Sequence, residues 1–439
     1  MAGKDFPHAS ILEGLRFTAQ VAVPNVIQGL FRRRRAAVAV ATRAGADGLA
    51  VSFMTGLKRS YGNGPLWIRV AKDEALLVIG EKAIRQVLGK SPEPFAADPE
   101  PKKSGMAHFQ PDALTISRNP EWEDRRHFTE NVLDTGKPVH RLADEFAAIS
   151  VEEAEKLPRM LDWDTFNESV RRVTRRVILG EGAADDAELS ELLGQLMDKS
   201  NPPGGGSDEL YQRFHEKLQS CVDAGRPGSL AGLLADAPRT ELTNPAGQVT
   251  HWLFALGDTL AINAMRCLAL LAGHDQVAAR VLEELAEADL RTGEGVAGLR
   301  VLEASLQEAM RLWPTTPMLS RELTSDVDWD GVKVTKGTQV VIVNTFNHRD
   351  RDSHAFADRF APDEWLSGGA ADDWSFNHFS HGPQGCPGTG LALLVGKATI
   401  GTILRDHDLK PLGSALAPDK PLPHMLDYFS LRFELVPRP

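Results

Sequence analysis

The feature that most constrains the fold of this chain is one long segment, residues 245–273, that is apolar on nearly every side. Asn244 and Pro245 stand where a helix would begin, because asparagine caps helix N-termini and proline is favoured at the first helical position. About 29 residues form a helix of roughly 43 Å, long enough to cross a domain. A helix that is apolar all round is buried. The sequence therefore predicts a central helix around which the rest of the chain packs.

Two polar residues, Asp258 and Thr259, interrupt the middle of this helix. A buried carboxylate is costly unless it has a partner or a function. The alternative is a structural pair, with a satisfied aspartate and a threonine hydroxyl that bonds back to the carbonyl four residues earlier. The residues alone leave both interpretations open.

Most of the remaining chain has helical patterning, with few strand signals. One hairpin is expected in residues 65–80, and a second in residues 332–346 with its turn at Lys336 and Gly337. The hydrophobic content of 42% in 439 residues is ample for a large core. We expect one domain, residues 1–439, mainly α with a smaller β-rich lobe. The parts expected to be β-rich are about 60–80, 320–346 and 425–437.

Charge and cysteine content argue against several classes of protein. A net charge of −11 disfavours a nucleic-acid binder, because such proteins need positive charge to neutralise phosphates. The cysteines Cys221, Cys267 and Cys386 form no Cys-x-x-Cys pair, which disfavours a zinc ribbon, a four-cysteine cluster and a disulfide framework. Scattered free thiols are typical of a reducing cytosol. We therefore expect a cytoplasmic protein that binds no nucleic acid.

A run of four arginines, residues 32–35, is the exception to the acidic balance. It follows an apolar segment of about 15 residues, which is too short for a spanning helix of roughly 20 residues. The start of the chain also lacks the pattern of a signal peptide. We expect no integral membrane segment and interpret the arginines as a solvated helix face. A patch for a membrane surface or an acidic partner is the alternative.

The stretch FSHGPQGCPG, residues 379–388, places Cys386 on a tight loop. Glycine and proline on both sides forbid a regular helix or strand there. An apolar helix follows, so the sulfur lies just before a helix N-terminus, where an anion is stabilised and the pKa of a thiol is lowered. The loop therefore favours a thiolate. A free cysteine packed as a small apolar side chain is the alternative.

Three further groups stand out by their spacing. Glu308 and Arg311 are three apart on a predicted helix, so they share a face and can pair. Trp122 and Arg126 are four apart, so an indole N–H and a guanidinium could reach one carboxylate. Arg359 stands in a turn-rich stretch between aromatic residues. Each has an ordinary explanation, such as a weak surface ion pair, but their combination in this order is more specific.

Taken together, the sequence resembles a cytochrome P450 of the soluble bacterial type. The motifs span residues 122–388, and the strand-rich ends are similar to the smaller β lobe of that family, so the resemblance covers nearly the whole chain. It implies the cytochrome P450 fold, with a long central helix crossing the domain. The matching motifs are Phe379-x-x-Gly-x-x-x-Cys386-x-Gly388, Glu308-x-x-Arg311, the Arg359 turn, Asp258-Thr259 and the pair Trp122 and Arg126.

The resemblance implies a haem b cofactor with iron bound by one protein ligand. Cys386 would be the axial thiolate, Phe379 would pack beside the haem, and Gly388 would belong to the loop whose backbone approaches the porphyrin. The residues assigned to the haem propionates are Trp122, Arg126, Arg321 and Gln384.

The resemblance also assigns roles on the other side of the cofactor and behind it. Thr259 would hold oxygen and a water by hydrogen bonds, and Asp258 would relay protons from solvent. Glu308, Arg311 and Arg359 would form a buried structural triad behind the cysteine loop.

Two positions depart from the family pattern. Gln384 stands where arginine or histidine is usual, so propionate binding is expected to depend more on Arg126 and Arg321. In the central helix, Leu256 replaces a glycine that normally opens a groove for dioxygen. Either Gly257 supplies that room instead, or the pocket above the haem is narrower.

The activity implied is that of an oxidoreductase, a monooxygenase that inserts one atom of O₂ into a small organic substrate by hydroxylation or epoxidation. Electrons would come from NAD(P)H through a separate ferredoxin and its reductase, and a monomer is expected. A peroxide-driven peroxygenase is one alternative. It would use an arginine facing a substrate carboxylate in place of the acid–alcohol pair, whereas Arg266 lies about two turns from Thr259. A non-catalytic haem-binding sensor is the other.

Overall fold

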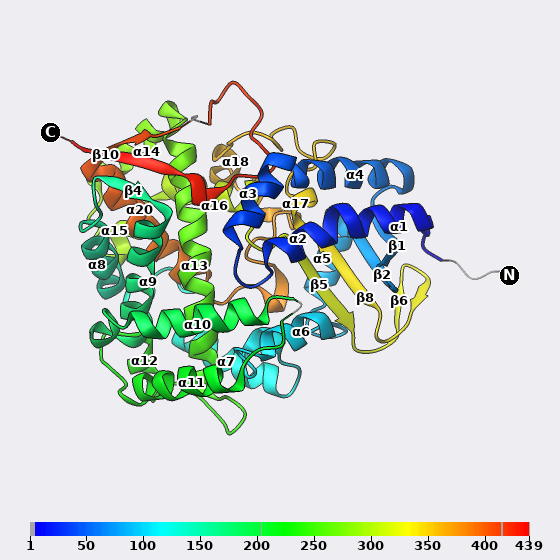
Figure 1. The fold of residues 1–439 in the computed structure, drawn as a ribbon, viewed down its shortest axis with the longest axis horizontal. Helices are drawn as coiled ribbons and strands as arrows, with labels where there is room; N and C mark the ends of the chain where they lie inside the picture. The colour runs from blue at the N-terminus through cyan, green and yellow to red at the C-terminus, as the bar shows by residue number, and fades with distance from the viewer. Residues whose placement is uncertain (1–4, 203, 414–415, 439) are drawn as a thin grey trace.

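The computed structural model describes residues 5–202, 204–413 and 416–438. A helical part and a smaller part that holds the main β-sheet lie side by side, with the two ends of the chain on opposite sides (Figure 1). The architecture is therefore mainly α with a small β region, as predicted from the sequence.

The helices carry most of the core. In chain order they are α1 (Ile11–Phe17), α2 (Val23–Gln28), α3 (Arg35–Ala44), α4 (Ala46–Tyr61), α5 (Glu81–Gly89), α6 (Glu100–Ala107), α7 (Glu121–Val132), α8 (Ala143–Ala154), α9 (Trp163–Leu179), α10 (Ala187–Ser200), α11 (Asp208–Asp223), α12 (Leu230–Leu233), α13 (Pro245–Leu271), α14 (Asp275–Glu287), α15 (Gly293–Ala297), α16 (Arg300–Leu312), α17 (Asn344–Asn347), α18 (Asp363–Leu366), α19 (Gly369–Asp372) and α20 (Thr389–Asp406).

The strands form three sheets within the described residues. The largest has the order β1 (Gly64–Val70), β2 (Asp73–Ile79), β8 (Gln339–Val343), β5 (Met318–Leu323) and β3 (Phe95–Ala96). The second has the order β4 (Met160–Asp162), β10 (Arg432–Pro437) and β9 (His407–Pro411), and the third pairs β6 (Val327–Trp329) with β7 (Val332–Val334).

The first predicted hairpin is confirmed, because β1 and β2 pair antiparallel from Gly64 opposite Ile79 to Val70 opposite Asp73. The second is wrong. β8 joins β2 in parallel and β5 antiparallel, while β7 pairs with β6 in a different sheet. The turn between β6 and β7 explains the difference. Asp330 and Gly331 both have positive φ (55° and 83°) and form a tight hairpin turn, so β7 pairs with β6 and not with β8.

The predicted central helix is confirmed as α13. It begins after Asn244, whose side chain accepts a hydrogen bond from the Gly247 N–H at 3.2 Å. Helices α9, α11, α16 and α20 pack around it. By length and composition, α13 and the bent pair of α3 and α4 are the described segments that could cross a bilayer, but α13 is mostly buried inside the protein.

A fully buried ion pair ties α16 to the segment that follows α17. Glu308 and Arg311 are both inaccessible to solvent, and two guanidinium N–H groups donate to the two carboxylate oxygens at 2.6 and 2.8 Å. Arg311 also donates to the carbonyls of His348, Ala357 and Arg359 at 2.9–3.0 Å. One desolvated cation therefore holds a whole connecting segment against the helix.

Arg359 takes part in this network only through its backbone. The expected triad placed Arg359 in a buried position with Glu308 and Arg311, but the Arg359 side chain is exposed to solvent. The carboxylate of Glu308 already accepts two bonds from Arg311, one from Trp365 Nε1 at 2.7 Å and one from the Ala361 N–H at 2.9 Å. Its lone pairs are thus fully used, which leaves no acceptor for a second guanidinium.

We expect Glu308→Ala to lower the free energy of unfolding by about 3–5 kcal/mol, because it leaves the Arg311 charge buried and unpaired. Soluble yield and the urea midpoint measure the effect. Glu283→Ala removes an exposed carboxylate from the neighbouring helix α14 and serves as the matched control. Equal yield and midpoint in the two variants would mean that the buried network contributes little.

Candidate active site

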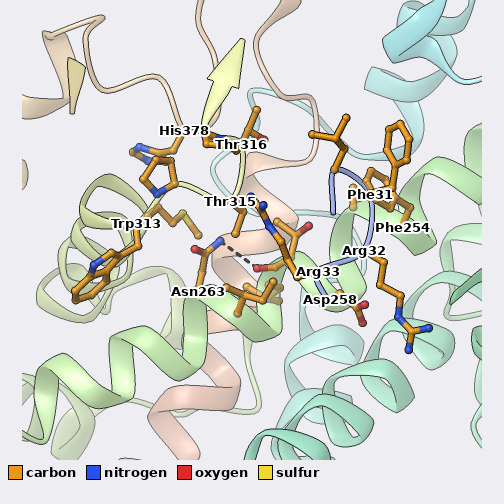
Figure 2. A pocket seen from close by; sticks show the side chains of 18 of the residues that line it. Phe31, Arg32, Arg33, Phe254, Asp258, Asn263, Trp313, Thr315, Thr316 and His378 are labelled. Carbon is orange, nitrogen blue, oxygen red and sulfur yellow. Dashed lines mark hydrogen bonds between the residues drawn. The ribbon is translucent and has the colours of Figure 1, made fainter. Parts of the chain in front are cut away.

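A cavity of about 1070 Å³ lies between α13, the start of β5, the loop before α20 and the segment between α2 and α3. Apolar and polar side chains both line it, which suits an organic molecule held in one orientation. Figure 2 shows part of its wall: Phe31, Arg33, Phe254, Asp258, Asn263, Trp313, Thr315, Thr316 and His378.

Cys386 and Phe379 form part of this wall. The loop that carries them is held by a hydrogen bond from the Cys386 N–H to the Phe379 carbonyl at 2.7 Å. Gly382 has a φ of 70°, and a Cβ atom there would come within 2.3 Å of the Leu88 carbonyl oxygen, so only glycine fits. The Cys386 side chain is accessible from the cavity while protein surrounds it on the other sides.

The pKa of the Cys386 thiol is raised, whereas the loop sequence predicted that it would be lowered. Burial is the main cause, and it outweighs the opposing effects of the Gly388 N–H, the Thr389 hydroxyl and the Arg126 charge. A cation bound to the sulfur would reverse this balance, because a coordinating thiol is deprotonated. The loop is therefore better suited to a metal ligand than to a free nucleophile.

Asp258 lies on α13 and has a partner that the sequence did not reveal. Arg171, on α9, donates from Nε and Nη2 to the same carboxylate oxygen, Oδ1, at 3.0 and 2.8 Å. Among the described residues nothing donates to Oδ2. Asp258 also lines a second cavity, of about 30 Å³, between α9, α10 and α13. Its carboxylate thus stands between this small cavity and the large one.

Thr259 has a hydroxyl that is available to the large cavity. Elsewhere on α13, the Thr250 hydroxyl donates to the carbonyl four residues earlier at 3.0 Å. No such bond from Thr259 to the Ala255 carbonyl occurs in the described part of the chain. The Thr259 carbonyl instead accepts from Asn263 Nδ2 at 3.1 Å (Figure 2). The back-bond of the structural alternative is therefore not formed within the described residues, whereas Asp258 has the partner that this alternative expected.

The two positions beside this pair differ from the expected oxygen groove. The Leu256 side chain is buried and lines the large cavity. Gly257 lines the small cavity, and a Cβ atom added there would meet no atom within 4 Å. Gly257 therefore does not widen the large cavity, and Leu256 makes this part of it narrower.

One end of the cavity carries two buried cations. Arg321, on β5, donates from Nε to Ser91 Oγ at 3.1 Å and from Nη1 to the Ser320 carbonyl at 2.9 Å, and burial lowers its pKa to about 10. Lys102, which the sequence did not single out, lines the same cavity, and burial and the Arg321 charge lower its pKa to about 7. Its Nζ already donates to the Ala97 carbonyl, the Thr115 carbonyl and Thr115 Oγ1 at 2.7–2.8 Å. Arg321, whose Nη2 donates no hydrogen bond within the described residues, is therefore the group that suits a carboxylate of a cofactor.

The other residues expected to bind propionates lie beside the cysteine loop. Arg126 donates from Nε to Glu130 and from Nη1 to the Gly385 carbonyl, both at 2.6 Å. Trp122 is mostly buried, and Gln384 has a buried Oε1 without a hydrogen-bond partner. Among the described residues that line the cavity, none of these three occurs.

The sequence predicted that the arginine run forms a solvated helix face. This prediction is wrong. Residues 32–34 precede α3 and lie in a loop along the cavity, and only Arg35 begins the helix. Gly29, at φ 94°, ends α2, and the Phe31 N–H donates to Asn201 Oδ1 at 2.9 Å. These contacts fold the loop inward. An arginine-rich sequence gives no sign of which member of the run will be buried.

Comparisons with known proteins agree with this geometry. The family model described as Cytochrome P450 matches residues 208–426. Cytochrome P450 4c3 of Drosophila melanogaster is 32% identical over 202 residues, which is 43% of this chain and 38% of that protein. Human aromatase is 28% identical over 205 residues, 45% of this chain and 39% of that protein. The matched region thus spans about two fifths of the length of these curated relatives.

Solved structures match over more of the chain. Retinoic acid-bound cyanobacterial CYP120A1 aligns with a TM-score of 0.71 and 20% identity, covering 88% of this chain and 94% of that one. A cytochrome P450, CYP102L1, aligns with a TM-score of 0.70 and 16% identity, covering 88% and 98%. The chain belongs to the cytochrome P450 family, whose cofactor is haem b.

The residues present fit that cofactor. The Cys386 thiol faces the cavity, and Arg321 has an Nη2 that donates no hydrogen bond within the described residues. These groups match a metal that needs a soft anionic ligand and a macrocycle that carries carboxylates.

We expect Cys386→Ser to abolish the long-wavelength absorption of the reduced carbon-monoxide complex that is typical of haem-thiolate proteins, because a serine oxygen cannot replace the thiolate. Difference spectra of haem-loaded protein measure it. Cys221→Ser, a half-buried cysteine of α11, is the control and should keep the band. Wild-type protein with full haem content and no such band would refute the assignment of the ligand.

Proposed function

We propose that the protein is a monooxygenase that inserts one oxygen atom from O₂ into a small organic substrate, by hydroxylation or epoxidation. The observation that carries the proposal is that one cavity is lined both by Cys386 and by the Asp258–Thr259 pair. When bound, haem supplies the activation of dioxygen and the oxidation itself. The residues of the chain bind the substrate, orient it and deliver protons.

Proton delivery in this proposal uses the two oxygens of Asp258 differently. Arg171 fixes the orientation of the carboxylate through Oδ1, which leaves Oδ2 to accept and release a proton. The small cavity of about 30 Å³ is large enough for a water molecule next to Asp258. A proton can therefore pass from this side of α13 to the large cavity, where the Thr259 hydroxyl stands next along the helix.

The source of electrons belongs to the same proposal: NAD(P)H, through a separate ferredoxin and its reductase. The proposal also includes that the protein is a monomer in the cytoplasm and that it is of the soluble bacterial type. The peroxygenase alternative would replace the acid–alcohol pair with an arginine. It is disfavoured because Asp258 and Thr259 both line the cavity and the nearest arginine on α13, Arg266, lies about two turns from Thr259. A sensor without turnover would not need Asp258 or Thr259.

We expect Asp258→Asn to slow turnover by about 10²-fold, because it removes a positioned proton-transfer group. The rate is measured with the reconstituted redox chain, on a substrate found by screening for shifts of the haem absorption. Wild-type protein that turns over with hydrogen peroxide alone, and an Asp258→Asn variant of undiminished rate, would support the peroxygenase instead.

The variant Thr259→Ala tests the role of the Thr259 hydroxyl. We expect NAD(P)H and O₂ to be consumed as before while more hydrogen peroxide and less product are released, since the hydroxyl that would hold oxygen is gone. The ratio of product to NAD(P)H measures this coupling. Thr250→Ala is the matched control, because its hydroxyl already donates to the Ala246 carbonyl. Equal coupling in both variants would leave Thr259 without a role in the reaction.

A further inference from the structure

Three of the four consecutive arginines, residues 32–35, have partners elsewhere in the chain. Arg32 pairs with Asp198 at 2.5 Å, and Arg35 pairs with Asp164. Arg34 donates to two backbone carbonyls at 3.2 Å each. Each of these three arginine side chains therefore has a partner within the chain.

The fourth, Arg33, has no hydrogen bond to any described residue. Its Nη1 is sealed from solvent and has no partner, and its side chain lines the large cavity. In Figure 2 the Arg33 side chain extends toward the middle of the cavity, whereas that of Arg32 extends away from it. An unpaired buried charge costs several kcal/mol. A charge kept in such a place therefore indicates a ligand that compensates it.

A second cation lies in electrostatic range of Arg33. Arg266, on α13, uses Nη1 for a backbone carbonyl but has a buried Nε without a partner, and its guanidinium stands 5.3 Å from the centre of the Tyr428 ring. The Arg33 charge helps to lower the pKa of Arg266, although burial is the larger cause. Two guanidinium groups thus face the same region with N–H groups to spare.

The one carboxylate that acts on both cations does not neutralise them. Asp47, on α4, lines the cavity and attracts Arg33 and Arg266, but forms no ion pair within 4.0 Å among the described residues. Burial raises the pKa of Asp47 and lowers that of Arg33 despite this attraction. The Tyr428 hydroxyl, whose pKa burial raises, is the other titratable group close to both arginines. Neither guanidinium forms an ion pair with a carboxylate among the described residues.

The haem carboxylates do not account for this region. Arg321, the cation assigned to them, acts electrostatically on Lys102. The groups that act on Arg33 and Arg266 are a separate set: Asp47, Tyr428 and Asp427. The cavity thus has two separate groups of charged residues, and the cofactor uses one.

We propose that the substrate is an organic acid whose carboxylate binds Arg33 and Arg266. The inference rests on the proposed function, since it names the substrate class of the same cavity. A guanidinium fork binds a carboxylate through two parallel hydrogen bonds, and Phe31, Phe254 and Phe429 supply apolar wall for the hydrocarbon body. Residue 266 lies about 10 Å along α13 from residue 259. The carbon that is oxidised is therefore several bonds from the carboxyl carbon.

Titration calorimetry of the haem-loaded protein tests the proposal with two matched pairs of probes: decanoate against decanamide, and 4-phenylbutanoate against its amide. We expect wild-type protein to bind at least one acid about 10- to 100-fold more tightly than its amide, the range for a hydrogen bond to a charged group. Arg33→Gln should reduce that preference to about threefold or less. Arg33→Lys, which keeps the charge without the fork, should restore part of it.

Arg32→Gln is the matched control, because it removes the same charge from the same loop but from a side chain that pairs with Asp198. It should keep the preference for the acid. Arg33→Met is a second uncharged variant in case the glutamine variant folds poorly. Equal affinity of both acids and their amides for wild-type protein would overturn the proposal. An Arg33→Gln protein that keeps the preference for the acid would also overturn it. The same holds for an Arg33→Gln protein that loses haem while its affinity for acids is unchanged.

The calorimetric result does not depend on turnover. A preference for acids that disappears in Arg33→Gln, in a protein that oxidises neither acid nor any other ligand, would support this inference and overturn the proposed function. Oxidation of neutral ligands by a protein without any preference for acids would overturn the inference and leave the proposed function intact.

Discussion

The position of the cysteine loop depends on the buried pair of Glu308 and Arg311. Arg311 donates to the His348 carbonyl, and His348 Nδ1 donates back to the Arg311 carbonyl at 3.1 Å. The other ring nitrogen, Nε2, accepts from the Asn377 N–H at 3.1 Å, and the Asn377 carbonyl accepts from Ser380 at 2.7 Å, inside the loop. Burial lowers the pKa of His348 to about 3, which keeps the ring neutral and able to accept. A chain of hydrogen bonds therefore runs from the ion pair to the segment that presents Cys386.

Helix α13 brings together groups that must act on one molecule from different sides. Successive residues of a helix point about 100° apart, so Asp258 can meet Arg171 and the small cavity while Thr259 meets the large one. Two turns further, Arg266 faces the region that holds Arg33. Because the helix is buried among its neighbours, the spacing of these residues is fixed by the helix backbone.

The parts of the fold that could be predicted are those that a local sequence pattern determines. The apolar run with its Asn-Pro start predicted α13, and the glycines and prolines around Cys386 predicted a loop. Pairing between distant segments could not be read in this way, so β7 and β8 were joined wrongly into one hairpin although Asp330-Gly331 is a strong turn signal. The roles of Arg33, Arg171 and Arg359 depend on which guanidinium is buried and what it meets, which tertiary packing decides. The pKa of Cys386 was misjudged for the same reason, since its burial outweighs the effect of the helix N-terminus.

The loop between α2 and α3 has no regular structure, yet it carries a charge into the cavity that the core helix α13 also lines. Substitutions there leave the buried ion pair, the cysteine loop and the acid–alcohol pair untouched. In evolutionary terms, Arg33 lies on a segment that tolerates change better than α13, which carries both the acid–alcohol pair and Arg266. A single exchange at position 33 could shift such a protein from acids to neutral molecules while the oxidation chemistry stays the same. Diversity within a group of close homologues would then accumulate first in this loop.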